Sequence, residues 1–114
     1  MNPLTVTELV KEAHQTALEK GWWDKPRTVG DVIALIHSEL SEALECYRRG
    51  GTEAIVNVTL GENNKPEGFF VELADAIIRI ADLAGRYNVD LEEILRMKLE
   101  YNKNRPYRHG NKQL

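Results

Sequence analysis

The 114-residue chain lacks the features that mark disulfide-rich, zinc-binding and membrane proteins. Its single cysteine, Cys46, excludes an internal disulfide and a cysteine-based zinc site. No apolar stretch approaches the roughly 18 residues that a membrane-spanning helix needs. The opening residues, MNPLTVTELV, have neither the basic region nor the apolar run of a signal peptide. We therefore expect a cytoplasmic protein that has no membrane partner.

The chain also lacks the excess of positive charge that is typical of nucleic-acid-binding proteins. Its net charge is −3 at pH 7, so we expect no nucleic-acid partner. Basic residues do collect at the end, because residues 102–114 contain Lys103, Arg105, Arg108 and Lys112 and no acid. The length predicts a single domain over residues 1–114, with a modest core and a basic C-terminal tail over 102–114.

Hydrophobic periodicity predicts an all-α fold with four helices and no convincing strand. The expected helices span about residues 5–20, 28–49, 66 or 69 to 87, and 90–101. Residues 50–68 form a long connection rich in Gly, Asn and Pro, whose β-branched middle, AIVNVTL, is expected to form a short strand or an extended strap. Long connections of this kind are often functional.

The third predicted helix is apolar on almost every side. Its polar residues form one line, Glu72, Asp75, Arg79 and Asp82, and we expect Asp82 to be a surface or interface acid. A helix with this pattern is buried on most sides. In a four-helix domain of this size, such burial requires a second subunit, so the sequence predicts a homodimer or a larger assembly.

Two matched pairs of acids carry the chemical information in the sequence. Glu39 and Glu42 are three residues apart in the second helix, and Glu72 and Asp75 are three apart in the third. Residues at this spacing share a helix face. Four acids gathered beside a core repel one another and lose hydration unless a cation compensates them. Carboxylate oxygens suit Mg²⁺ or Mn²⁺, so the pattern predicts a metal site inside a helical bundle.

These motifs resemble the MazG-like, all-α nucleoside triphosphate pyrophosphohydrolases. The resemblance rests on Glu39-Leu-Ser-Glu42, on Glu72-Leu-Ala-Asp75, and on the basic ending from Lys98 to Tyr107, which contains Asn102 and Arg105. A Trp-Trp-Asp turn precedes the first acidic helix, and the resemblance covers about residues 22–109. One departure is Ser38, which occupies a position where many members carry an additional acid.

The resemblance implies a four-helix bundle-type MazG-like domain, assembled as a dimer or tetramer, that hydrolyses nucleoside triphosphates to monophosphate and pyrophosphate. Glu39, Glu42, Glu72 and Asp75 are the expected ligands of Mg²⁺, with Mn²⁺ as a substitute, and either Glu39 or Glu42 is the expected catalytic base. Substrate contacts are expected from Lys98, Asn102, Arg105, Trp22 and Trp23. An aromatic ring provides a surface on which a base can stack. The implied role is control of the nucleotide pool.

Three other interpretations compete with this one. The acids could form a solvated face with internal salt bridges, and either Trp could be core or interface packing. A ferritin-like di-iron site is disfavoured, because it expects Glu-x-x-His and neither acidic pair supplies a histidine. A non-catalytic helical dimerisation or nucleotide-sensing module would retain the fold without turnover.

Overall fold

A computed structural model describes residues 2–107, and this part of the chain is mostly helical, which confirms the all-α prediction. Residues 108–114 lie outside the described residues, so the basic tail can be followed only as far as Tyr107. The elements in chain order are α1 (Val6–Glu19), α2 (Val29–Ala54), β1 (Thr59–Leu60), the 3-10 turn η1 (Glu62–Asn64), β2 (Pro66–Glu67), α3 (Phe69–Arg86) and α4 (Leu91–Lys103).

Side-chain caps fix the start of three helices. The hydroxyl group of Thr5 accepts a hydrogen bond from the backbone N–H of Glu8, and Asp90 does the same for Glu93 at the start of α4. Thr28 and Asp31 form a reciprocal capping box at the start of α2. Because caps act on local backbone groups, the sequence placed these boundaries within a few residues.

The end of α2 and the connection after it differ in detail from the prediction. Regular helix geometry is interrupted at Gly51, which has φ 71°, close to the predicted end at residue 49, but a short helical turn continues to Ala54. The connection then forms an antiparallel hairpin in which Thr59 pairs with Glu67 and Leu60 with Pro66. The expected short strand is therefore present, and it is paired.

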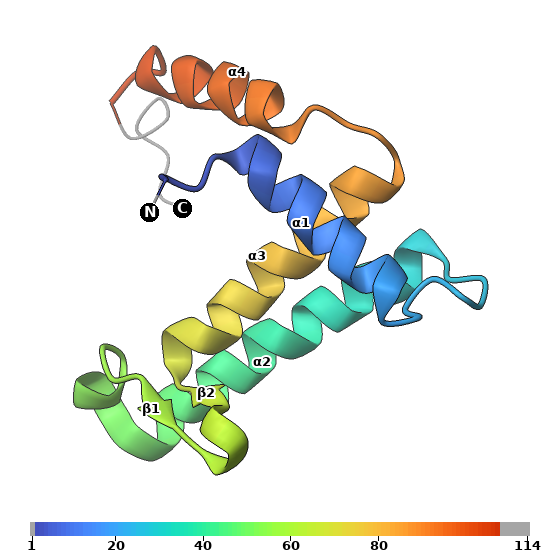
Figure 1. Cartoon of the computed structure of the whole chain (residues 1–114). Coiled ribbons are helices and arrows are strands. Elements are labelled where there is room, and N and C mark those ends of the chain that lie inside the picture. The colour runs from blue at the N-terminus through green and yellow to red at the C-terminus, as the bar shows by residue number, and fades with distance from the viewer. Residues whose placement is uncertain (1, 108–114) are drawn as a thin grey trace.

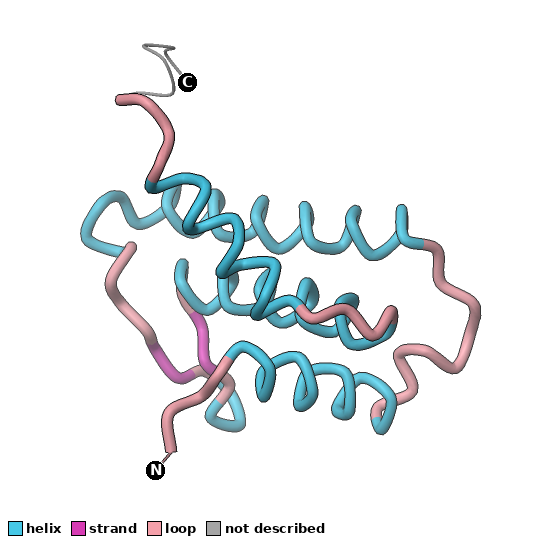
Figure 2. Tube along the Cα trace, turned by 90° about the horizontal axis from the view of Figure 1, so that it is seen from above, coloured by secondary structure: helices cyan, strands magenta, loops and turns pink. Residues whose placement is uncertain are grey.

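Helix α3 is the central element of the fold (Figure 1), because it packs against both α1 and α2. The hairpin joins the end of α2 to the start of α3 (Figure 2). Helix α4 packs mainly against α1 and stands apart from the α2–α3 pair. A bundle that encloses all four helices thus remains a prediction for an assembled form of the protein.

The core of the described chain is thin. Its buried hydrophobic residues are mostly alanines, and only Val32 and Ile36 have larger side chains. The alanines are Ala13, Ala17, Ala43, Ala76, Ala81 and Ala84. Large apolar side chains on α2, α3 and α4 remain exposed, among them Leu44, Ile77 and Met97. Across residues 2–107, no helix combines the length and the apolar character needed to cross a membrane.

Candidate metal centre

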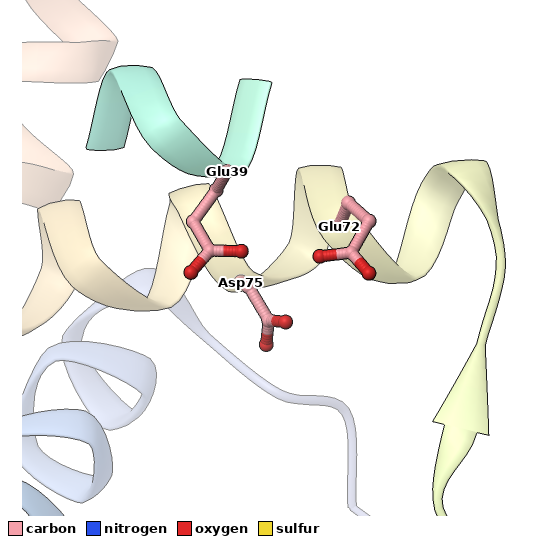
Figure 3. A group of neighbouring side chains, drawn as sticks. All are labelled: Glu39, Glu72 and Asp75. Carbon is pink, nitrogen blue, oxygen red and sulfur yellow. The ribbon is translucent and has the colours of Figure 1, made fainter. Parts of the chain in front are cut away.

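Three of the four predicted metal ligands meet between α2 and α3 (Figure 3). Glu39 extends from α2 toward α3, where Glu72 and Asp75 lie one turn apart. Ligand oxygens of the three carboxylates lie within 4.8 Å of one another. Glu39 is the most buried of the three, with a side chain 12% exposed. The two acidic pairs therefore face each other across the helix interface.

Glu42, the fourth predicted ligand, lies at the edge of this group. Its side chain is exposed, and it is not among the three whose oxygens converge. It nevertheless interacts with Glu72 by hydrogen bonding and by charge, so it stands beside the cluster. A carboxylate in that position is accessible to water while remaining close to the other acids.

Crowding of the acids changes their protonation. The pKa of Glu72 is raised to about 7, mainly by burial, and also by hydrogen bonding with Glu42 and Glu39 and by the charges of Glu42 and Asp75. Burial also raises the pKa of Asp75; the charges of Glu39 and Glu42 act in the same direction, whereas those of Arg79 and Lys65 oppose it. The cluster thus carries repulsion that a cation could relieve.

Two basic residues stand close to these acids. The guanidinium of Arg79 donates a hydrogen bond from Nε to Glu39 at 3.1 Å, so this cation of α3 pairs with the acid of α2. Lys65, in the hairpin, acts electrostatically on Asp75. Sequence reasoning missed Lys65. The signal that could have identified it is its position in the long connection just before the second acidic helix.

A cleft of about 490 Å³ opens beside the cluster. Its charged lining comes from Glu39 on α2, from Asp75, Arg79 and Asp82 on α3, and from Glu12 and Lys20 on and just after α1. Apolar residues of α1 and α3, including Leu9, Ala13 and Ile78, form the apolar wall. Trp22 lines the same cleft. Volumes of this size suit a small organic ligand. The cleft therefore joins an apolar wall with an aromatic ring to a group of carboxylates.

The two tryptophans have different environments. Trp22 is 43% exposed, and the Arg79 guanidinium lies 4.8 Å from its ring centroid. Trp23 packs against the core formed by Val32, Ile36 and Ala76, in agreement with the packing alternative. Of the two, only Trp22 has a ring that is available to a ligand in the cleft.

The predicted substrate contacts on and just after α4 are not at this cleft. Lys98, Asn102 and Arg105 are absent from its lining, which comes from α1, the connection after α1, α2 and α3. Lys98 and Arg105 instead lie near the ring of Tyr101, at 4.8 Å and 5.6 Å from its centroid. Within a single chain, α4 and the acidic cluster are thus separate.

Asp82 corrects the prediction of a surface or interface acid. It is 8% exposed and is the one buried charged residue in the described part of the chain. Both of its oxygens accept from Nε1 of Trp23, at 3.0 Å and 3.2 Å, and His14 Nδ1 lies 2.8 Å away. The prediction was wrong because these partners come from distant segments, which no local spacing reveals.

The donor set of the cluster fits a hard divalent cation. Mg²⁺ binds oxygens at roughly 2.1 Å, so two ligands on opposite sides of one ion lie about 4.2 Å apart. The observed spread of up to 4.8 Å needs only a small contraction to reach that geometry.

Comparison of the chain with protein-family models, curated proteins and solved structures gave no match. The interpretation therefore depends on the residues themselves.

Proposed function

We propose that the protein hydrolyses nucleoside triphosphates, NTP or dNTP, to nucleoside monophosphate and pyrophosphate in a Mg²⁺-dependent reaction. One observation carries this proposal: a single cleft contains both an exposed indole ring and carboxylates from two helices. A base and a triphosphate need these two surfaces side by side. The resemblance of the two acidic motifs and the basic ending to MazG-like pyrophosphohydrolases supports the same activity.

Glu39, Glu72 and Asp75 would hold Mg²⁺, with Glu42 completing the acidic group. The bound ion would neutralise phosphate charge and make a nearby water more acidic. Because Glu39 is paired with Arg79, we assign Glu42 as the base. Its carboxylate takes a proton from a water that attacks the α-phosphorus. The bond from that phosphorus to the bridging oxygen breaks, and pyrophosphate leaves.

Charge on the outer phosphates needs cations near the cleft. Arg79 lines it, and Lys65 lies close enough to influence Asp75. Lys98, Asn102 and Arg105 could contribute only if α4 of a second copy reached the cleft, since α4 of the same chain stands apart from it. Their proposed role therefore depends on the homodimer or homotetramer that the exposed apolar side chains favour.

The alternative is a non-catalytic dimerisation or nucleotide-sensing module, which the separation of α4 from the cleft favours. Pyrophosphate release in Mg²⁺, measured with each common NTP and dNTP, distinguishes the two. The enzyme releases pyrophosphate, and EDTA abolishes that release; a sensor binds nucleotide without turnover. Release of inorganic phosphate in place of pyrophosphate would show cleavage at a different bond.

Two variants test the site assignment within this assay. We expect Glu42→Gln and Asp75→Asn each to lower turnover at least about a hundredfold, because the first loses the base and the second a metal ligand. Glu45→Gln is the matched control, since Glu45 is an exposed acid on α2 whose hydrogen-bonding partner is Arg49 on the same helix. Wild-type rates in both site variants would show that the assignment is wrong.

A further inference from the structure

The contacts of Asp82 connect three parts of the fold. Asp82 lies on α3, His14 on α1, and Trp23 in the connection between α1 and α2. The Trp23 ring also meets His14 edge-on, with centroids 6.3 Å apart, and Arg86 lies 4.7 Å from its centroid. A buried carboxylate is costly unless donors satisfy it. Here the two donors that satisfy Asp82 also attach the connection and α1 to the central helix.

This arrangement bears on the position of the neighbouring residue, Trp22. The connection contains no regular helix or strand between the two capped helices, so its conformation depends on a few anchors. The backbone N–H of Trp22 bonds to Ala17 O at 3.0 Å, which holds the start of the connection to α1. The indole of Trp23 holds the next residue to α3.

The exposed ring of Trp22 has two guanidinium groups as its cation–π neighbours. Arg79 and Arg27 lie 4.8 Å and 5.6 Å from its centroid, but the ring is 43% exposed. The same ring lines the cleft that contains Glu39 and Asp75. Its orientation toward the cleft therefore depends on where the backbone of residues 22 and 23 is fixed.

We propose that Asp82 and His14 are positioning residues that act through Trp23 to hold the Trp22 ring as the stacking wall for a nucleobase. This inference rests on the proposed function, because it assigns a nucleoside triphosphate to the cleft. Asp82 also lines the cleft, but it is only 8% exposed and its oxygens are engaged by Trp23 and His14, so we assign it a positioning role. It keeps the Trp22 ring at a fixed position relative to the acidic cluster, so that the base and the phosphates can bind at the same time.

The first test follows the two rings directly. The chain has two tryptophans, so fluorotryptophan labelling gives two ¹⁹F resonances, which Trp22→Phe and Trp23→Phe assign. In Asp82→Asn, we expect the Trp22 resonance to shift or broaden together with that of Trp23. Glu45→Gln should leave both unchanged. A Trp22 resonance that stays in place while the Trp23 resonance moves would overturn the proposal.

The second test measures binding. For a non-hydrolysable nucleoside triphosphate analogue, Trp22→Ala should raise Kd between about 5-fold and 150-fold, the range expected for loss of one stacked base. Asp82→Asn and Trp23→Phe should each raise Kd about 5-fold or more, while Mn²⁺ binding without nucleotide stays at the wild-type value. Unchanged Kd in these two variants would contradict the positioning role.

Two controls separate this inference from its premises. Trp23→Phe keeps a smaller aromatic ring in the core and removes the indole N–H, so it serves where Asp82→Asn fails to fold by circular dichroism. If the wild-type protein binds the analogue and the variants bind it equally well, the positioning role fails and the proposed function stands. If the wild-type protein binds no nucleotide, the proposed function fails, and with it the stacking role.

Discussion

Glu72 has an ordinary side chain in an environment that alters its proton affinity. Its pKa is raised to about 7, first by burial and then by neighbouring acids. A metal ion binds the ionised form of a carboxylate, so it competes with the proton. Protonation of this one residue therefore links pH, metal binding and stability.

Metal affinity should depend on pH through Glu72. Below about pH 7 the ion must displace a proton, so Mn²⁺ affinity should rise with pH and then level off above that value. Glu72→Gln should bind Mn²⁺ more weakly and remove much of this dependence. Electron paramagnetic resonance titrations between about pH 5.5 and 8.5 measure free Mn²⁺ directly. Identical pH profiles for both proteins would contradict the role of Glu72.

Stability of the metal-free protein should respond in the opposite sense. The folded-state pKa of Glu72 lies above the ordinary pKa of 4.5 for a glutamate, so the folded state binds more protons between that value and about 7. Stability then falls as pH rises through this window, and Asp75 contributes with the same sign. Urea unfolding should measure the free energy of unfolding of Glu72→Gln minus that of wild type. This difference should be more positive at pH 8 than at pH 5. An equal difference at the two pH values would count against this linkage.

Among the elements, the hairpin before α3 brings Lys65 toward the acidic cluster. If Lys65 neutralises the outer phosphates, Lys65→Gln should raise KM for the triphosphate several-fold and change kcat little, because the metal ligands are untouched. Lys11→Gln, at an exposed position on α1, is the control and should leave KM unchanged in the assay of pyrophosphate release. Equal KM values for wild type and Lys65→Gln would exclude the phosphate contact.

Gly68 joins the hairpin to α3 in a conformation that only glycine adopts easily. Its φ is 145°, and an added Cβ would collide with the carbonyl oxygen of Asn57. Gly68→Ala should therefore destabilise the protein by about 1–3 kcal/mol in urea unfolding. Gly30→Ala, within α2, has room for a Cβ and should be neutral or stabilising by up to about 1 kcal/mol. Equal effects of the two substitutions would refute this account of the junction.

Local signals predicted the elements well, and long-range contacts explain what they missed. Thr5, Thr28 and Asp90 cap helices through neighbouring backbone groups, so their sequence positions sufficed to locate the helix starts. Glu39 and Asp75 could be paired from their spacing because two amphipathic helices expose their acids beside a shared interface. The burial of Asp82 could not be predicted, because it depends on Trp23, 59 positions away.

At the scale of the whole molecule, the exposed apolar surface favours self-association. Helices α2, α3 and α4 all carry large exposed apolar side chains, whereas the core consists mainly of alanines. Such a surface is typical of interfaces between subunits. We expect sedimentation equilibrium to give a dimer or a tetramer. Ile77, 53% exposed on α3, offers a test: Ile77→Asp should shift the protein toward monomer, and Lys11→Asp on α1 should not.

The position of α4 is a second property of the whole molecule that sequence could not provide. The motif with Lys98, Asn102 and Arg105 suggested phosphate contacts, yet in one chain these residues lie on or just after α4, which packs mainly against α1. Spacing along a helix describes a face and does not describe where that face docks. Contact between α4 and the cleft of another copy therefore requires self-association, which sedimentation equilibrium measures.

The central claim is that acids from α2 and α3 bind divalent ions between them. Anomalous diffraction from crystals grown with Mn²⁺ tests it most directly, because it locates the ion without reference to activity. We predict a peak between Glu39, Glu72 and Asp75 that disappears in Asp75→Asn. Crystals with Mn²⁺ bound elsewhere, and none between these three carboxylates, would contradict the account.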